Sequence, residues 1–134
     1  MAVTVTEAFQ RVFRGEAAHV SAARTWTLAC LPATYRRADD VALVVTELAT
    51  NAVLHSASAL PGATFTVRLE LRQDGVEVTV TDAGAPLVPA RRPDADEYGR
   101  GLAIVRELAE ATIITATPAG GRATSCRFDP CGRR

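Results

Sequence analysis

Three polar side chains recur at helical spacing in the middle of the chain. Glu47, Asn51 and His55 lie at i, i+4 and i+8, so each is rotated by about 40° from the one before it around a helix. Their row follows the edge of an apolar stripe, where a carboxylate or amide needs a partner, and a ligand carrying Mg²⁺ and phosphates would supply one. The alternative is a partly solvated helix flank, because polar pairs at i, i+4 are frequent in helices. The stripe consists of five apolar residues at i, i+3, i+4, i+7 and i+11, namely Val41, Val44, Val45, Leu48 and Ala52.

A carboxylate and a glycine stand where the clearest expected strand ends. Asp82 is the last residue of the alternating segment 75–82, and Gly84 follows two positions later. A carboxylate at a strand end could accept a hydrogen bond from the amino group of adenine, and a glycine there would let the base approach closely. The alternative is an Asx-type turn that closes the strand, and the Asp-x-Gly pattern alone leaves both interpretations open.

Two glycines precede the last apolar helical pattern. Gly99, Arg100 and Gly101 are expected to open a helix at Leu102, which would bring free backbone N–H groups and the positive end of the helix to one point. Phosphate would fit there, and Arg100 would either contact it or be solvated. The alternative is a hinge or cap, because Gly-x-Gly by itself is a weak motif. The sequence around Thr124, in the last expected strand, does not by itself decide whether this residue has a structural or a binding role.

Composition excludes several mechanisms. All 15 basic residues are arginine and none is lysine, which rules out Schiff-base chemistry, a Walker-A lysine and the strand lysine of eukaryotic-type protein kinases. The 15 acidic residues bring the formal net charge to zero, so no overall field attracts nucleic acid or an anionic membrane. We therefore expect neither direct nucleic-acid binding nor membrane binding.

Cysteine usage and the first residues indicate the compartment. Cys30, Cys126 and Cys131 are an odd, widely spread set, which is typical of a reducing compartment and predicts no disulfide. The C-x4-C spacing, with His19 and His55 far away, matches no recognised metal site. The first 13 residues hold neither an apolar run of membrane-spanning length nor a charged-then-apolar leader. We expect a soluble, cytoplasmic protein.

Helical and extended periods alternate along the chain without an internal repeat. The length of 134 residues suits one compact domain spanning 1–134. In chain order we expect a strand at 9–14, a helix at 16–30, a helix capped by Asp39 or Asp40, strands at 64–72 and 75–82 joined at Asp74–Gly75, an irregular segment at 83–98, a helix from Leu102 to Ala109, and strands at 111–117 and 122–128. This order predicts an α+β fold, a two-layer sandwich in which helices cover one face of a mostly antiparallel sheet.

The order of the motifs resembles the GHKL superfamily of ATPases and kinases, which have the Bergerat nucleotide-binding fold. The matching blocks are ELATNAVLHS on a helix, VTDAG at a strand end, a long lid-like loop, GRGLAIV on a helix and GGRATSCRF in the last hairpin. The chain is most similar to the single-domain anti-sigma-factor serine/threonine kinases of bacteria, which have a histidine-kinase-like ATPase domain. The resemblance covers about residues 9–128. Blocks in this order are far more specific than any one of them.

The resemblance implies roles for the residues of the first two blocks. Asn51 matches the asparagine that binds the Mg²⁺ bridging the ATP phosphates. Glu47 matches the glutamate that positions or deprotonates the attacking nucleophile. Asp82 matches the aspartate that recognises adenine, and Gly84 matches its glycine neighbour. His55 matches a frequent family histidine whose role stays open.

The resemblance also implies roles for the later blocks. Gly99, Gly101 and Leu102 match the glycine box whose backbone cradles phosphate, with Arg100 between its glycines. Thr124 matches a hairpin threonine that contributes to the adenine pocket. These residues complete an expected site for ATP and Mg²⁺.

The function that the resemblance implies is an ATP-dependent protein kinase. It would phosphorylate an anti-anti-sigma (STAS-type) partner on serine or threonine, bind a sigma factor, and regulate transcription by partner switching; the family also implies a homodimer. The alternative is a non-catalytic module in which ATP only orders the loop and switches partner affinity. Ala85 and Pro86 stand where the fullest Asp-x-Gly-x-Gly pattern continues, and the resemblance by itself does not separate the two functions.

Overall fold

The computed structural model describes residues 4–56, 60–84 and 95–130, without the side chains of His55 and of residues 95–99. The expectations for the His55 side chain, for the loop residues 85–94 and for Cys131 lie outside the described residues. All other predicted elements can be compared with the structure.

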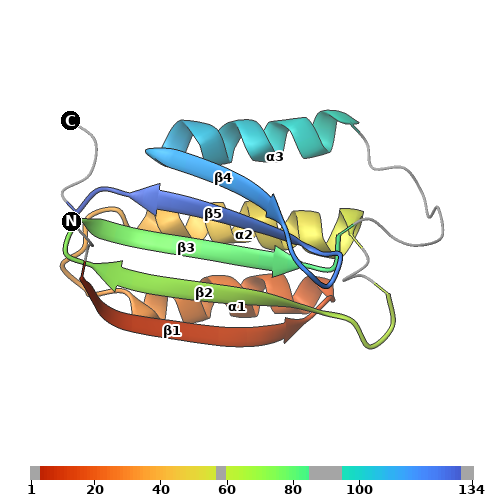
Figure 1. The fold of residues 1–134 in the computed structure, drawn as a ribbon, viewed down its shortest axis with the longest axis horizontal. Coiled ribbons are helices and arrows are strands. Elements are labelled where there is room, and N and C mark those ends of the chain that lie inside the picture. Colours follow the sequence, from red (N-terminus) through yellow and green to blue (C-terminus); the bar gives the residue numbers. More distant parts are fainter. Residues whose placement is uncertain (1–3, 57–59, 85–94, 131–134) are drawn as a thin grey trace.

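The described residues form five strands and three helices (Figure 1). In chain order these are β1 (Val5–Arg14), α1 (Ala17–Cys30), α2 (Ala38–His55), β2 (Thr64–Arg72), β3 (Gly75–Asp82), α3 (Ala95–Leu108), β4 (Ala111–Ala116) and β5 (Arg122–Phe128). The predicted order of strands and helices is confirmed. No helix within the described ranges is both long enough and apolar enough to cross a bilayer.

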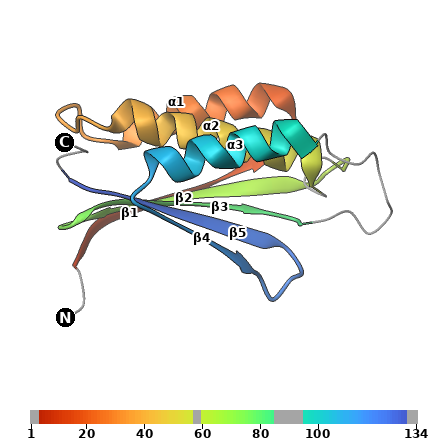
Figure 2. The same cartoon turned by 90° about the horizontal axis from the view of Figure 1, so that it is seen from above.

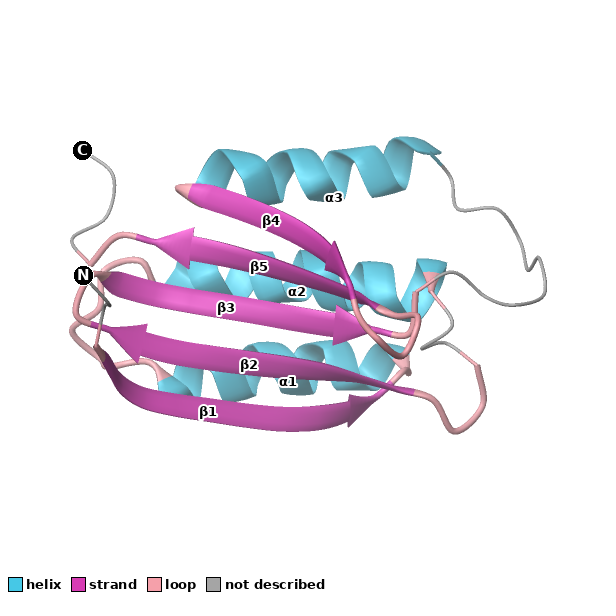
Figure 3. Ribbon diagram, in the orientation of Figure 1, coloured by secondary structure: helices cyan, strands magenta, loops and turns pink. Residues whose placement is uncertain are grey.

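The strands form one sheet in the order β1-β2-β3-β5-β4, and every neighbouring pair is antiparallel. All three described helices lie on the same face of this sheet, with α2 between α1 and α3 (Figure 2). The helix layer and the strand layer are distinguished by colour in Figure 3. The predicted α+β two-layer sandwich is confirmed.

The core fills the space between the two layers. Phe13 of β1 stacks on Phe65 of β2 with ring centroids 5.5 Å apart, and it meets Trp26 of α1 edge-on at 5.9 Å. Both geometries are favourable for aromatic pairs. The other apolar residues of β2, which alternate with polar ones along the strand, are buried as well: Val67, Leu69 and Leu71.

The β2–β3 hairpin turns at Gln73–Asp74, one position before the predicted Asp74–Gly75, because Gly75 already pairs with Arg72. Gly75 has a φ of +132°, and a Cβ there would come within 1.9 Å of the Phe128 carbonyl oxygen. Only glycine satisfies both conditions. The close approach of β5 therefore requires glycine at position 75 as much as the turn does.

The second helix buries its predicted stripe. All five stripe residues are at most 4% exposed, as expected for apolar positions on one helix face. The helix begins at Ala38 with Arg37 as its N-cap residue, so the prediction that Asp39 or Asp40 caps it is wrong. Both aspartates lie in the first turn, where their negative charge interacts favourably with the helix N-terminus.

The third helix begins earlier than predicted. It starts at Ala95 rather than at residue 102, so segment 95–98 is helical instead of irregular. Gly99 and Gly101 lie inside the helix, and the prediction that they open it is wrong. Glycine costs about 1 kcal/mol relative to alanine inside a helix, so the glycine pattern predicts a later start than the backbone shows.

Arg37 ties the start of α2 to the connection between α3 and β4. Its side chain is only 6% exposed and donates a hydrogen bond of 3.1 Å to Asp40. It also donates to the Glu110 carboxylate and to the Leu108 carbonyl oxygen, and its guanidinium carbon lies 5.1 Å from the centroid of the Phe128 ring. A buried cation needs such partners to offset the loss of its hydration.

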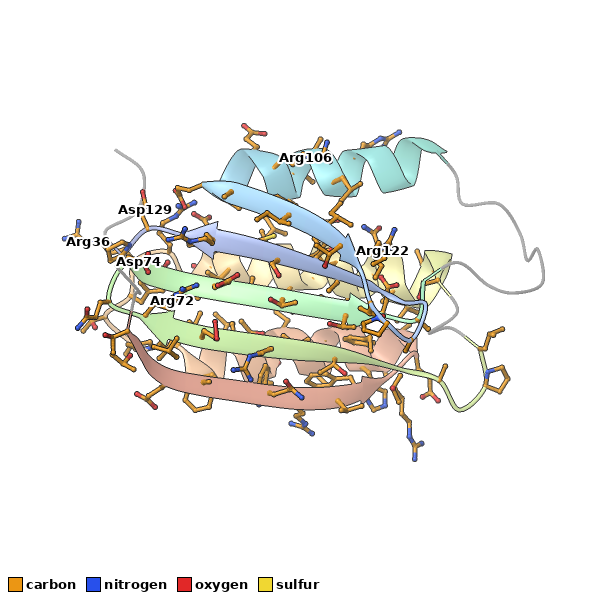
Figure 4. The ribbon with its side chains drawn as sticks, in the orientation of Figure 1. Arg36, Arg72, Asp74, Arg106, Arg122 and Asp129 are labelled. Carbon is orange, nitrogen blue, oxygen red and sulfur yellow. The ribbon has the colours of Figure 1, made fainter. Side chains whose placement is uncertain are left out.

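Replacing Arg37 with alanine should therefore lower the free energy of unfolding by about 3 kcal/mol, because a buried, multiply bonded cation is lost. Urea denaturation followed by circular dichroism measures this difference. The matched control is Arg36→Ala, since Arg36 is the preceding, exposed residue (Figure 4) and its loss should change stability by no more than about 0.5 kcal/mol. Equal effects of the two substitutions would contradict the role assigned to Arg37.

Candidate functional site

A narrow pocket lies between α2, α3 and the adjoining ends of β3 and β5. Four of the predicted site residues line it, namely Asn51, Asp82, Leu102 and Thr124. The other lining residues are Leu48, Val80 and Arg122, and the space between all seven is too narrow for a water molecule. The structure therefore brings together side chains from all four sequence motifs that carried the resemblance: ELATNAVLHS, VTDAG, GRGLAIV and GGRATSCRF.

The register of β3 against β5 explains the sheet side of this pocket. Val80 lies opposite Thr124, and Asp82 lies opposite Arg122. Directly opposed residues in an antiparallel pair point to the same face. All four therefore point toward the helices, because Val80 belongs to the buried core.

Asp82 is held by two partners. Its side chain is 5% exposed; Oδ1 accepts a 2.7 Å hydrogen bond from the Gly84 N–H, and Oδ2 accepts bonds of 3.0 and 3.3 Å from Nη2 and Nε of Arg122. The bond to Gly84 is the Asx-type turn considered from the sequence. Asp82 also lines the pocket. Its role in recognising a base therefore stays a prediction, in addition to the observed turn.

Sequence reasoning missed Arg122. The residue lies 40 positions after Asp82 in the chain, and the contact exists only because β3 and β5 pair. A local motif carries no signal for such a contact. A correct alignment of these two strands would have been needed to find it.

Gly84 packs against the turn between β4 and β5. Its φ is +74°, and a Cβ there would lie 2.7 Å from the carbonyl oxygen of Gly120. A Cβ on Gly121 would in turn lie 2.3 Å from the Asp82 carbonyl oxygen. Glycines thus let this turn and the end of β3 touch, while the expected approach of a base to Gly84 remains a prediction.

Glu47 and Asn51 of α2 face Gly101 of α3. A Cβ on Gly101 would lie 3.1 Å from Glu47 Oε2, and 3.6 and 3.7 Å from the Asn51 amide oxygen and nitrogen. Asn51 is 5% exposed and Glu47 is half-buried. Within residues 4–56, 60–84 and 95–130, neither side chain forms a hydrogen bond or an ion pair. Among the described residues, the only fully buried side-chain nitrogen or oxygen without a hydrogen-bond partner is Nε of Arg72, so the polar atoms of Glu47 and Asn51 still reach solvent and are accessible to a ligand with both donors and acceptors.

The remaining predicted residues lie along α3. Gly99 and Gly101 are in its second turn, whereas the free N–H groups of a helix belong to its first four residues. Arg100 is exposed and is not among the residues that line the pocket. The roles of Gly99, Arg100 and Gly101 in phosphate binding therefore stay predictions.

The side chains of the site could hold a metal ion only if phosphates and water supplied most of its ligands. Among the described side chains, no three His, Cys, Asp or Glu residues gather into a metal site. Asn51 offers one oxygen, which fits Mg²⁺ because this ion takes most of its ligands from phosphates and water. Cys126 is fully buried, and burial raises its thiol pKa to about 11, so at neutral pH it is a packed thiol rather than a metal-binding thiolate.

The chain is similar to known proteins over most of its length. A family model described as the histidine kinase-like ATPase domain matches residues 13–126, a range that contains every residue of the pocket. The chain is also 29% identical over 104 residues to a protein named anti-sigma F factor from Pasteuria penetrans. That alignment covers 70% of this chain and 69% of the relative.

Gly101→Val should separate the two helices at the site, because its branched side chain would enter the space occupied by the Glu47 carboxylate. We expect the free energy of unfolding to fall by about 2 kcal/mol, measured by urea denaturation. Ala103→Val, at an exposed position of the same helix, should cost less than about 1 kcal/mol. A Gly101 variant as stable as the Ala103 variant would show that α3 does not pack closely here.

Proposed function

Because the chain belongs to the histidine kinase-like ATPase family, we propose that it binds ATP in the pocket between α2, α3, β3 and β5 and acts as an anti-sigma-factor-like serine/threonine kinase. The observation that carries this proposal is that Glu47 and Asn51, which have no hydrogen-bond partner among the described residues, lie near the buried Asp82. Asp82 would accept a hydrogen bond from the base, and Glu47 and Asn51 would face the phosphates.

The base end would use Asp82 and its surroundings. The carboxylate can accept a hydrogen bond from the amino group of adenine. Leu48, Val80 and Leu102 line the same pocket and offer apolar surface to the faces of a ring, and the Thr124 hydroxyl adds a polar group. Such a mixture of apolar walls and a few convergent polar groups is typical of cofactor pockets.

The phosphate end would use Asn51, Gly101 and Glu47. The Asn51 amide oxygen would hold Mg²⁺, which offsets the phosphate charge when bound. The missing side chain of Gly101 leaves Glu47 and Asn51 uncovered on the side of α3. Glu47 would orient the serine or threonine hydroxyl of a protein substrate and accept its proton as the γ-phosphoryl group is transferred.

The partner of this kinase would be an anti-anti-sigma (STAS-type) protein, and the chain would also bind a sigma factor. The similarity to a protein named anti-sigma F factor supports this assignment. Regulation of transcription would then follow from partner switching, in which phosphorylation of the STAS-type protein changes whether this chain binds that protein or the sigma factor.

Asn51→Ala should reduce the affinity for Mg-ATP by about tenfold or more, since the buried group that we assign to the cation is removed. Isothermal titration calorimetry with and without Mg²⁺ measures the effect, and the affinity without Mg²⁺ should change little. Thr50→Ala is the matched control, because Thr50 is the neighbouring residue on α2 and bonds to the Thr46 carbonyl oxygen. An unaltered Mg²⁺ dependence in the Asn51 variant would refute this assignment.

Glu47→Ala should retain ATP binding but slow phosphoryl transfer by about a hundredfold, because the general base is lost. The assay incubates the protein with Mg-ATP and candidate STAS-type proteins and follows the phosphate mass shift on a partner serine. If wild-type protein binds ATP and transfers phosphate to no partner, the kinase assignment fails and the non-catalytic switch is favoured.

A further inference from the structure

The acceptor that we assign to the base is already engaged in the structure. Asp82 Oδ1 accepts the Gly84 N–H at 2.7 Å, and Oδ2 accepts two N–H groups of Arg122 at 3.0 and 3.3 Å. A carboxylate has about four acceptor positions, so these bonds use most of them. Arg122 also lines the pocket, whose interior is too narrow for a water molecule.

The two members of this ion pair differ in exposure. The Asp82 side chain is 5% exposed, whereas the Arg122 side chain is 27% exposed. A buried carboxylate needs a partner at all times, because an unpaired charge in the interior is costly. A guanidinium near the surface can be solvated instead. The pair can therefore open only when another donor replaces Arg122 at Asp82.

We propose that Arg122 competes with the nucleobase for Asp82, so that adenine binding requires the Asp82–Arg122 ion pair to open. This inference rests on the proposed function, because it takes Asp82 as the residue that accepts the adenine amino group. The amino group is a donor and can replace the guanidinium, whereas a base with only an acceptor at that position cannot. Arg122 thus lowers the affinity for ATP and makes it depend on a donor from the base.

The test compares two arginines of β5. Arg122→Ala removes the competitor at the pocket. Arg127→Ala is the matched control, because Arg127 also pairs with an aspartate, Asp74, which lies at the opposite end of the sheet from Arg122 (Figure 4). Calorimetry measures the Kd of each variant for Mg-ATP and for Mg-tripolyphosphate, which lacks the base.

Arg122→Ala should bind Mg-ATP about tenfold more tightly than wild type, which corresponds to about 1.4 kcal/mol, and Arg127→Ala should bind it as wild type does. Tripolyphosphate affinity should be equal in all three proteins, since the competition concerns the base alone. Equal or weaker ATP binding by Arg122→Ala overturns the inference. Wild-type protein that does not bind ATP overturns the proposed function and this inference with it, so the two failures are distinguishable.

A second measurement uses the unaltered protein in case Arg122→Ala does not fold. The Nε–H proton of Arg122 bonds to Asp82, so it should exchange slowly with water and give an observable NMR signal. Saturating ATP should accelerate that exchange, whereas tripolyphosphate should not. A signal that stays protected with ATP bound would show that the ion pair persists beside the base and would refute the competition.

Discussion

The packing of α2 against the sheet is the constraint on which the rest of the site depends. Its stripe is at most 4% exposed, and fully burying a side chain such as valine or leucine contributes about 1.5–3 kcal/mol. Rotation of the helix would expose this surface, so the orientation of the helix is fixed. The row that contains Glu47 and Asn51 lies beside the stripe and is placed with it, facing Gly101. Apolar burial thus positions polar groups that have no partner among the described residues.

Ion pairs at the two ends of α2 differ in which member is buried. Near the helix start the cation is buried, because Arg37 is 6% exposed while its partners Asp40 and Glu110 are 40% and 21% exposed. At the site the anion is buried, because Asp82 is 5% exposed and Arg122 is 27% exposed. Arg37 has several partners at once and holds α2 in place. Under the competition proposed above, Asp82 would exchange Arg122 for a donor of the base.

Much of the fold follows from local patterns. The alternation in 64–72 and 75–82 predicted β2 and β3 with their observed bounds, because a sheet with one buried face imposes a period of two. The start of α3 was predicted wrongly, since glycines suggested an opening at residues 99–101 while the helix begins at Ala95. The caps proposed for α2 were wrong for a similar reason: Asp39 and Asp40 favour helix starts in general, but the Arg37 contacts place the start one residue before them.

The sequence by itself determined the element order, the buried stripe of α2 and the family to which the chain is similar, because periodicity and motif order are local properties of the chain. Only the tertiary structure decided that β5 lies beside β3, which brings Arg122 onto Asp82, and that Gly101 faces Glu47 and Asn51. These contacts join residues far apart in the chain. They depend on strand pairing and helix packing, which are settled by the burial of the whole core rather than by any one segment.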